Sequence, residues 1–468
     1  MNSNKKISIK WNKENFALEV SYSNIGELKQ EISQKTLVEP NRQKLFFKGK
    51  VLDDSFSLNN IPDGALLTMT GIPSMETGIS TDTDKKIVFI EDLSNEEKTK
   101  MLREQGEDIV YGLTNLGNTC YLNSTLQCLG RVPELRKALE DPTGVSNSNF
   151  MFALIKEMGK VYKQLDNAHD TVVPDALVST LRKMNPMFAE QERGVFKQQD
   201  AEECWSLLLN AIRDSLPNPS KGERFSSVLI EELFGIELEV QLQNVEETSE
   251  VKTKKEITFK LPCYIDNQTN DLLEGLKASL KENIELQSDV LARNSIFQKT
   301  QLINRLPPYL TVQFMRFFWK QANVSTGAKA GKAKILKSVI FSKFIDLYDF
   351  CTESTKVILD LGRKIETKML KEDRNFRIDN VKNVEGKEMI PTGRYQLIAV
   401  VTHTGRSADS GHYIGWAQKA EDKWTKYDDD TITTVNVTDI LELKGGGDWH
   451  MAYICIYKRL EVPFIETE

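Results

Sequence analysis

Two short stretches that lie far apart in the sequence carry the residue types of a cysteine nucleophile and its base. The first, GLTNLGNTCYLNSTLQCL at residues 112–129, holds Cys120 and Cys128. The second, SGHYIGWAQKAEDKWTKYDDD at residues 410–430, holds His412 and three consecutive aspartates. A thiolate attacks a carbonyl carbon once a base has taken the thiol proton, so these residue types indicate nucleophilic catalysis.

The first stretch predicts a helix that begins beside its first cysteine. The residues GNT at 117–119 interrupt the preceding segment and offer capping side chains, and three leucines follow on one helical face. Cys120 then lies in the first turn, where free N–H groups and the helix dipole favour a thiolate. Cys128 lies two turns further and is expected to be a buried structural thiol. For Cys120 taken alone, a structural role is an equally good interpretation.

The second stretch predicts a β-hairpin. A turn centred near Ala420 places His412 opposite Asp428, and Trp416 opposite Trp424. Partners on one face lie about 5 Å apart at Cβ, so a carboxylate bonds one imidazole nitrogen and leaves the other for a thiol. The prediction is a triad of Cys120, His412 and Asp428, with Asp429 next to it as the reserve candidate. The alternative is an ordinary strand histidine beside a solvated acidic turn.

Asn115 lies in the loop that enters the predicted cysteine helix. Its amide is a candidate donor to the oxyanion that forms during attack, an effect of order 10² in rate or more. A plain turn asparagine is the alternative. His403 and His450 lack an acidic partner at comparable hairpin spacing and are expected to be structural.

A third stretch, FKQQDAEECWSLLLNAI at residues 196–212, predicts a helix capped by Asp200. Helix capping by itself explains an aspartate at position 200, and the residue pattern indicates no further role. The buried stripe of this helix is expected to comprise Ala201, Trp205, Leu208 and Ile212.

Composition excludes several classes of protein. The 468 residues include 61 basic and 68 acidic ones, a net charge of −7, and no basic cluster suggests a nucleic-acid partner. No apolar run approaches the roughly 18 residues of a membrane span, and the N-terminus lacks the apolar core of a secretion signal. The six cysteines form no CxxC pair, so neither a disulfide framework nor a structural zinc site is indicated. We expect a cytosolic protein with reduced thiols.

The chain divides into three parts by pattern. Residues 4–72 alternate as strands around one helix whose apolar face is expected to hold Ile25, Leu28, Ile32 and Leu37. This ββαββ order, with KLFFKGKVLDD, resembles ubiquitin; a generic small β-grasp domain is the alternative. Residues 73–105 are polar and charged and are expected to be a flexible linker with a short helix at its end.

The remaining residues, 106–460, begin with helical patterns and turn strand-rich from about residue 225. Two polar excursions, 323–334 and 366–388, are expected to be solvated loops.

Four boxes in this order, GLTNLGNTCYLNSTLQCL, QQDAEE, LPPYLTVQFMRF and GHYIGWA…KWTKYDDD, resemble the ubiquitin-specific proteases, which are papain-like cysteine deubiquitinases. The resemblance implies that Cys120 is the nucleophile, His412 the general base, Asp428 the third member and Asn115 the oxyanion donor. It also implies that the ubiquitin tail is bound by Gln199, Asp200, Phe317 and Tyr413. Because the CxxC zinc motifs of many relatives are missing, we expect no metal, and no cofactor.

The resemblance also implies an architecture. It is an α+β chain in which a β-grasp ubiquitin-like domain precedes a papain-like protease domain of thumb, palm and fingers. The fingers are expected largely from residues 225–265 and 338–400.

With the ubiquitin-like domain and the ending GGGDWHMAYICIYKR, the chain is most similar to the branch of this family that binds the proteasome. The implied partners are ubiquitin, its conjugates and the proteasome regulatory particle, for a protein that is monomeric when free and located in the cytoplasm and nucleus. Two other functions stay open: a catalytically silent ubiquitin-binding scaffold and a shuttle adaptor.

Two flexible stretches predict regulation. TGRSADSG at 404–411 runs into His412, and NVSTGAKAGKAK at 323–334 follows a predicted strand. Both lie where the resembling proteins carry loops that block the tail channel. We therefore expect a poor enzyme in isolation that the proteasome activates.

Overall fold

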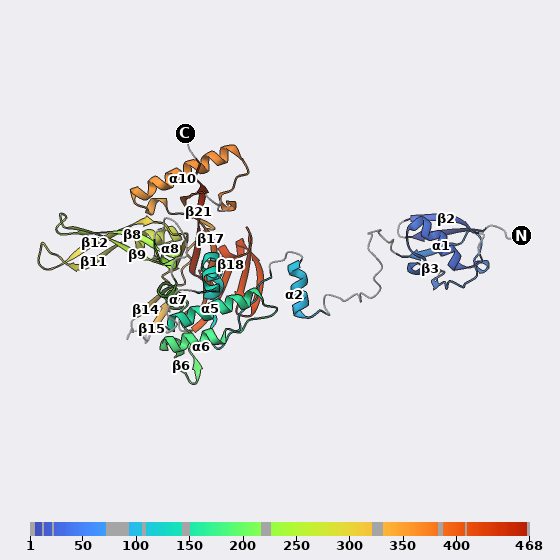
Figure 1. Ribbon diagram of the computed structural model, residues 1–468, viewed down its shortest axis with the longest axis horizontal. Coiled ribbons are helices and arrows are strands. Elements are labelled where there is room, and N and C mark those ends of the chain that lie inside the picture. The colour runs from blue at the N-terminus through green and yellow to red at the C-terminus, as the bar shows by residue number, and fades with distance from the viewer. Residues whose placement is uncertain are drawn as a thin grey trace. The chain divides into compact units, whose positions relative to one another are not determined.

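The computed structural model divides the chain into two compact units, Met1–Phe89 and Ile90–Glu468, which are described separately (Figure 1). The division falls inside the segment that the sequence predicts as a linker. The structure describes residues 5–11, 14–20, 23–71, 93–104, 109–142, 150–216, 226–320, 331–381, 387–407 and 410–465.

The described residues of the first unit form a five-stranded sheet, the α-helix α1 (Ile25–Thr36) and two short 3-10 helices. The strand order is β2-β1-β5-β3-β4, with β1 and β2 antiparallel and β5 parallel to β1. The central strands β1 and β5 are parallel neighbours, and α1 lies between them in the order of the chain. This is the β-grasp arrangement that the sequence predicted. The strands are β1 (Lys5–Trp11), β2 (Glu14–Val20), β3 (Lys44–Phe47), β4 (Lys50–Val51) and β5 (Leu66–Thr70).

Helix α1 packs on this sheet through most of the face that was expected. The Asn24 side chain accepts a hydrogen bond from the Glu27 N–H and caps the helix. Ile25, Leu28 and Ile32 are fully buried, but the expectation for Leu37 is wrong. Leu37 is 68% exposed because it ends the helix in the left-handed region, with φ at 56°.

The second unit begins with α2 (Asn95–Glu104), which lies at the end of the predicted linker. Thr99 is buried and its hydroxyl bonds the phenol of Tyr111, while Arg103 donates to the carbonyl of Ala168 at 3.2 Å. The last part of the predicted linker is therefore a helix attached to the second unit. Residues 73–92, predicted to be flexible, lie outside the described residues.

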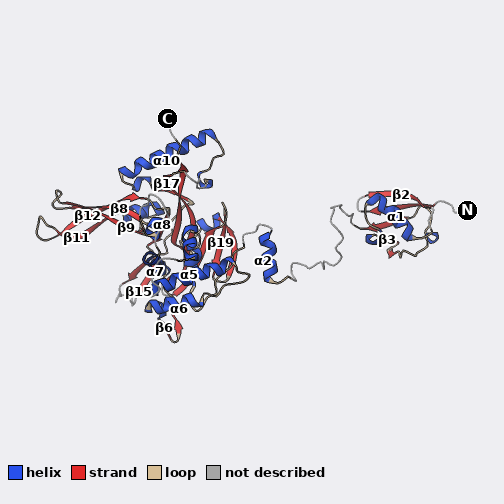
Figure 2. Ribbon diagram, in the orientation of Figure 1, coloured by secondary structure: helices blue, strands red, loops and turns tan. Residues whose placement is uncertain are grey.

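An eight-stranded sheet runs through the second unit (Figure 2). Its order is β10-β13-β21-β17-β18-β19-β20, with β16 also paired to β17. The long strands β17 and β21 form its centre. The strands are β10 (Leu261–Cys263), β13 (Tyr309–Phe314), β16 (Phe344–Asp346), β17 (Met389–Ser407), β18 (Ser410–Gln418), β19 (Lys423–Asp428), β20 (Thr431–Asn436) and β21 (Met451–Pro463).

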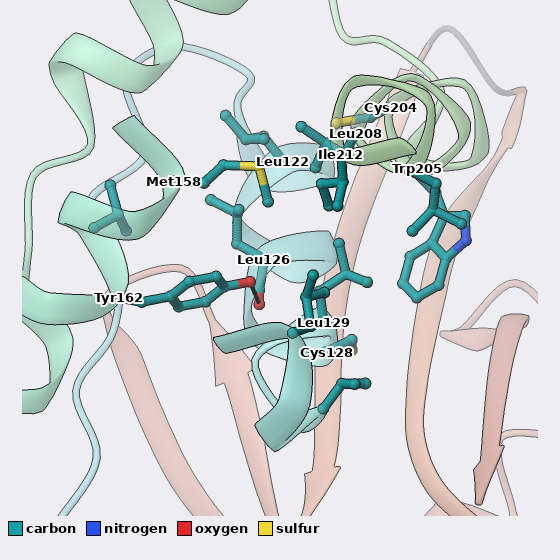
Figure 3. Close-up of a cluster of buried hydrophobic side chains, with 14 of the residues drawn as sticks. Leu122, Leu126, Cys128, Leu129, Met158, Tyr162, Cys204, Trp205, Leu208 and Ile212 are labelled. Carbon is teal, nitrogen blue, oxygen red and sulfur yellow. Dashed lines mark hydrogen bonds between the residues drawn. The ribbon is translucent and has the colours of Figure 1, made fainter. Parts of the chain in front are cut away.

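Helix α3 (Cys120–Leu129) packs between this sheet and other helices, and every one of its residues is buried. Figure 3 shows its leucines among side chains of α5 (Phe150–Asp166) and α7 (Ala201–Ser215). The stripe predicted for α7 is buried as expected. Further α-helices among the described residues of this unit include α4 (Pro133–Glu140), α6 (Asp175–Met184), α8 (Leu229–Phe234), α9 (Leu272–Ser279) and α11 (Val437–Leu441). A small hairpin joins β6 (Gln191–Glu192) to β7 (Val195–Phe196).

A four-stranded ribbon extends from the second unit (Figure 1). It contains β8 (Ile236–Asn244), β9 (Val251–Thr258), β11 (Lys281–Gln287) and β12 (Asn294–Arg305), in the order β11-β12-β8-β9. The prediction that residues 338–400 supply part of the fingers is wrong. Those residues form β16, α10 (Glu353–Glu372) and the start of β17 instead, because their apolar positions pack on the central sheet.

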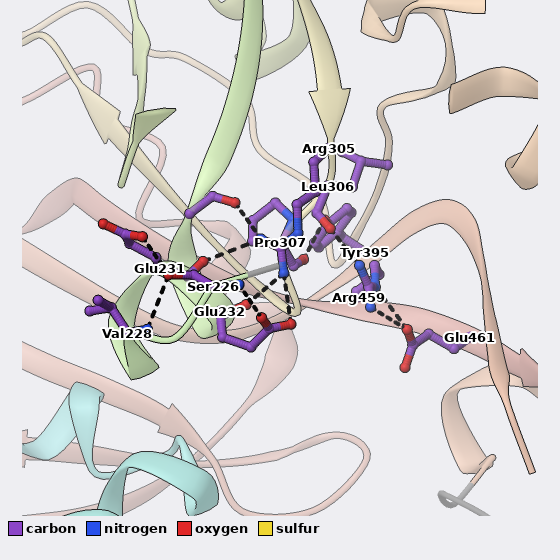
Figure 4. A network of polar contacts seen from close by, with 11 residues as sticks. Ser226, Val228, Glu231, Glu232, Arg305, Leu306, Pro307, Tyr395, Arg459 and Glu461 are labelled. Atoms are coloured by element: carbon purple, nitrogen blue, oxygen red, sulfur yellow. Dashed lines mark hydrogen bonds and ion pairs between the residues drawn. The ribbon is translucent and has the colours of Figure 1, made fainter. Parts of the chain in front are cut away.

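The base of the ribbon is fixed by Arg305, the last residue of β12 (Figure 4). Its guanidinium donates to the carbonyl of Gly235 at 2.7 Å and to the carbonyl of Glu232 at 2.9 Å. The same guanidinium pairs with the Glu232 carboxylate at 3.1 Å. The ribbon therefore begins from a rigid connection to α8.

Both predicted solvated loops are partly regular structure. Residues 331–334 form β15 (Gly331–Lys334), which pairs with β14 (Phe317–Lys320). Residues 366–372 continue α10, where Glu366 is buried because it pairs with Arg394 at 2.6 Å. Residues 321–330 lie outside the described part. Among the residues that are described, no helix combines the length and apolarity needed to cross a bilayer.

Candidate active site

Cys120 is the first residue of α3. The preceding turn carries Gly117 and Asn118 in the left-handed region, with φ at 87° and 54°. The Thr119 hydroxyl accepts from the N–H of Leu116 at 2.9 Å rather than capping the helix. Cys120 is 2% exposed and lies at the N-terminal, positive end of the helix dipole.

Helix α3 lies directly on β18. A Cβ atom added at Gly415 would lie 3.0 Å from the carbonyl of Ser124, so a larger residue would push the helix and the strand apart by a few tenths of an ångström. The close contact places the start of α3 beside the start of β18, and therefore Cys120 beside His412.

The register of the β18–β19 hairpin differs from the predicted one by two residues. Trp416 lies opposite Lys426, not Trp424, because the backbone N–H groups of Lys419 and Ala420 bond the carbonyl of Lys423 and make a wider turn. A slip of two residues keeps every side chain on its face, whereas a slip of one would reverse them. His412 and Asp428 therefore still meet.

The Nε2 atom of His412 lies 2.6 Å from Oδ1 of Asp428, which leaves Nδ1 for the thiol. The pKa of His412 is raised to about 9, first by a hydrogen bond with Cys120 and then by Asp428, against desolvation. Desolvation opposes ionisation of Asp428, yet its pKa is lowered overall because His412 and Lys426 bond the carboxylate. The arrangement is that of a thiol beside an imidazole, with a carboxylate that orients the imidazole.

Asn115 is held in the loop before Cys120 from both ends of its amide. Its Oδ1 accepts from the backbone N–H groups of Gly117 at 3.0 Å and Thr119 at 3.1 Å. Its Nδ2 donates to Asp429 at 2.8 Å, and the other oxygen of Asp429 accepts from Asn123 at 2.8 Å. Asp429 thus ties the hairpin to the cysteine loop and to α3.

The second cysteine of the helix, Cys128, and the two other C-terminal histidines, His403 and His450, lie in surroundings that do not suit a nucleophile or a base. Burial raises the pKa of Cys128 to about 12, and its sulfur faces the carbonyl of Val400 at 3.5 Å. Desolvation lowers the pKa of His403 to about 3 and that of His450 to about 4, so both rings are neutral. Within the described part of the chain neither ring bonds a carboxylate.

Asp200 caps α7 by accepting from the N–H of Glu202 at 2.8 Å. The phenol of Tyr453 bonds both Asp200 oxygens, at 2.8 and 3.0 Å, and burial raises the pKa of Asp200 to about 6. Gln199, next to it, is 8% exposed. The carboxylate is therefore part of a buried polar contact rather than a free cap.

Phe317 and Tyr413 gather with Tyr453 and His403 in one aromatic cluster. The Phe317 ring lies 5.1 Å from that of Tyr453, and the Tyr413 ring lies 4.6 Å from that of His403, between ring centres. Three of the four residues expected to bind substrate, Asp200, Phe317 and Tyr413, thus meet around Tyr453. Their role in binding stays a prediction, as does the expectation of no metal or cofactor.

Sequence reasoning missed Tyr453, Asn123 and Lys426, which all contact candidate site residues. Asn123 lies three residues after Cys120, and residues three apart lie on the same side of a helix. The sequence therefore contained a signal that Asn123 lies near the cysteine. Lys426 lies two residues before Asp428, on the same strand face. Tyr453 has only strand alternation to indicate that it points inward.

Comparison with known families agrees with this geometry. Residues 111–457 match the model of the family described as ubiquitin carboxyl-terminal hydrolase, and residues 7–70 match that of the ubiquitin family. The chain belongs to the ubiquitin carboxyl-terminal hydrolases. It is a cysteine-type ubiquitin hydrolase with a ubiquitin-like domain before its catalytic domain.

Similar relatives cover nearly the whole chain. Ubiquitin carboxyl-terminal hydrolase 6 of Arabidopsis thaliana is 36% identical, over 97% of this chain and 98% of that protein. Ubiquitin carboxyl-terminal hydrolase 6 of Schizosaccharomyces pombe is 33% identical, over 97% and 99%. Ubiquitin carboxyl-terminal hydrolase 14 of Caenorhabditis elegans is 31% identical, over 97% and 93%.

Proposed function

We propose that the chain releases ubiquitin from conjugates with Cys120 as nucleophile, His412 as general base and Asp428 as the group that orients the imidazole. The observation that carries this assignment is the 2.6 Å bond between His412 and Asp428, on a histidine whose pKa is raised first by Cys120. A histidine bound at one nitrogen by a carboxylate presents the other in a fixed direction.

The reaction proceeds in two stages. His412 takes the thiol proton, and the Cys120 sulfur attacks the carbonyl carbon of the last residue of the ubiquitin tail, forming a tetrahedral oxyanion. His412 then protonates the leaving amine, which leaves an acyl-enzyme. Water gives a proton to His412 and attacks the thioester, which releases the ubiquitin carboxylate and restores the thiol.

Asn115 is proposed as the oxyanion donor. Its amide nitrogen carries two hydrogens, and Asp429 accepts from that nitrogen at 2.8 Å. The second hydrogen is available for the oxyanion, because the oxygen of the same amide is fixed by the loop at Gly117 and Thr119.

A second part of the proposal is that the ubiquitin-like domain recruits the protein to the proteasome, which opens the catalytic domain. What supports this regulation is burial: Cys120 is 2% exposed and Tyr413 1%. In addition, Lys334 of β15 donates to the carbonyl of His403 at 2.6 Å and lies against the Phe317 ring. We infer that a substrate tail displaces the β14–β15 hairpin. A partner that binds the displaced hairpin better than the closed one would shift the equilibrium between these two conformations.

The location that we propose is the cytoplasm and nucleus, with a monomeric free protein. All six cysteines are free, which fits a reducing compartment.

The test is hydrolysis of a fluorogenic ubiquitin amide by the full chain, Cys120→Ala and Cys128→Ala. Cys120→Ala is expected to lose turnover and to keep its ubiquitin affinity, since the change removes the nucleophile and little surface. Cys128→Ala is the matched control because it removes a thiol from the same helix, and it is expected to retain turnover. Equal hydrolysis by Cys120→Ala and the parent protein contradicts the assignment.

A further inference from the structure

Lys426 contacts the one carboxylate that also holds His412. It lies in β19 two residues before Asp428, so both side chains lie on the same face of the strand. The Lys426 ammonium donates to Oδ2 of Asp428 at 2.9 Å, while Oδ1 faces His412 at 2.6 Å. The two oxygens of Asp428 are therefore divided between a lysine and the histidine.

The lysine is itself held in place. Its ammonium lies 5.7 Å from the centre of the Trp416 ring, its direct cross-strand partner in the hairpin. The Trp416 indole donates to the Thr402 hydroxyl at 2.8 Å, and this hydroxyl lies 3.2 Å from Nδ1 of His450. Trp416 thus serves as a fixed platform under the lysine stem.

The charges around Lys426 come from several elements. Asp428 on its own strand is the acid, and His412 on β18 is the other ionisable group that bonds that acid. His450 is neutral, because desolvation and then His412 lower its pKa to about 4. On the other side, the β20 residue paired with Lys426 is Thr433, which carries no charge.

We propose that Lys426 is a positioning residue of the hydrolytic site, whose ammonium holds the outer oxygen of Asp428 so that the inner oxygen stays on His412. This inference rests on the proposed roles of Cys120, His412 and Asp428. A carboxylate bound at one oxygen rotates about its terminal torsion, whereas one bound at both is fixed in direction.

The lysine also contributes charge. A cation near the site stabilises a thiolate and disfavours an imidazolium, so its removal makes both Cys120 and His412 harder to deprotonate. Both the acidic and the alkaline limb of the activity profile should then move to higher pH. A merely structural role would lower activity at every pH without moving the limbs.

The experiment compares the full-length Lys426→Gln, Lys426→Met and Lys426→Arg variants with Lys423→Gln, by steady-state hydrolysis of a fluorogenic ubiquitin amide across the pH range. Lys423 lies exposed at the start of the same strand, so it is matched in charge and element. Lys426→Met keeps the aliphatic stem on Trp416, and thermal unfolding checks that each variant is folded.

We expect Lys426→Gln and Lys426→Met to lower kcat about tenfold, with KM changed less than about twofold, and to move both limbs upward by about half a pH unit. Lys426→Arg should restore the parental limbs, and Lys423→Gln should behave as the parent. Unmoved limbs in folded Lys426→Gln and Lys426→Met, or an equal shift in Lys423→Gln, would overturn the inference. Retained hydrolysis in Cys120→Ala would instead overturn the proposed function itself.

Discussion

The side-chain amide of Asn115 donates a hydrogen bond to Asp429 at 2.8 Å, across 314 residues of sequence. The contact joins the loop before the cysteine helix to the turn after β19, whose residue Asp429 has φ at 53°. The backbone carbonyl of Asp429 also accepts from the N–H of Leu113 at 2.9 Å. The two halves of the site are thus tied together by the residue that follows Asp428, which separates the roles of the two neighbouring aspartates.

Asp428→Asn is expected to lower kcat by about 10²- to 10⁴-fold with little change in fold, because an amide favours the wrong tautomer of His412. Steady-state kinetics together with a circular-dichroism spectrum provides the check.

Asp429→Asn is the matched comparison. It weakens contacts to Asn115 and Asn123, so a smaller loss of kcat and a loss of about 1–3 kcal/mol in the free energy of unfolding are expected. If only Asp429→Asn were damaging, the assignment of Asp428 as the partner of His412 would be wrong.

The four histidines allow a direct reading of the ionisation state by NMR. The His412 imidazole should titrate near its raised pKa of about 9, and in Cys120→Ala this pKa should fall, because the hydrogen bond with Cys120 is the largest cause of the shift. His403 and His450 should stay neutral, with a lowered pKa of about 3 and about 4.

The same shift sets a dependence of stability on pH. Because folding raises the pKa of His412 from 6.5 to about 9, its protonation stabilises the folded state fully below about pH 6.5, and this stabilisation is lost as the pH rises through about 9. A His412 pKa below 6.5 in the folded protein would contradict this account.

Leu126→Ala in α3 should reduce the free energy of unfolding of the second unit by about 2–5 kcal/mol, because a fully buried side chain is removed from the cluster under the cysteine helix. Urea unfolding followed by tryptophan fluorescence measures the loss. Leu370→Ala is the control on an exposed helix surface, at 44% exposure, and should change stability by less than about 0.5 kcal/mol. Equal losses in both variants would show that α3 is not part of a tightly packed core.

Deletion of residues 1–75 is expected to leave basal hydrolysis of a fluorogenic ubiquitin amide nearly unchanged and to weaken proteasome recruitment greatly. The physical reason is effective concentration: a tethered binding domain raises the local concentration of the catalytic domain, and loop movement supplies the rise in kcat. The measurement compares full-length and truncated protein with and without purified proteasome. A full-length protein that is already at its maximal rate alone would contradict regulation by the proteasome.

Local patterns in the sequence were sufficient for much of the fold and the site. The start of α3 at Cys120 follows from the break at Gly117 and Asn118 and from the leucine stripe, although Thr119 does not cap the helix as its residue type suggested. The meeting of His412 with Asp428 follows from strand parity. The wrong register shows the limit, because the turn at Lys419 and Ala420 is set by backbone hydrogen bonds that side-chain patterns do not report. A register error of two residues leaves every side chain on the same face of the sheet, so the predicted contact between His412 and Asp428 is still correct.

Contacts between distant segments could not be predicted in this way. Asn123 reaches Asp429 across 306 residues, and Lys426 resembles any surface lysine until its partner is known. The prediction of a solvated loop at Glu366 failed for a similar reason. Its charge is typical of a loop residue, but in the fold Glu366 is buried in α10 and pairs with Arg394. Residues 323–330 and 408–409 of the predicted blocking loops lie outside the described residues, so their form stays a prediction.

The assignment of Cys120 as the nucleophile is tested most directly by covalent capture with ubiquitin that carries a C-terminal electrophile, followed by mass spectrometry of the digested adduct. We expect one modified residue, Cys120, with capture lost in Cys120→Ala, slowed strongly in Asp428→Asn and retained in Cys128→Ala. Candidate activators, including purified proteasome, are added in a parallel reaction, because a buried thiol reacts only after the site has opened. An adduct on another cysteine, or no adduct even with the activators present, would contradict the account and favour a ubiquitin-binding scaffold.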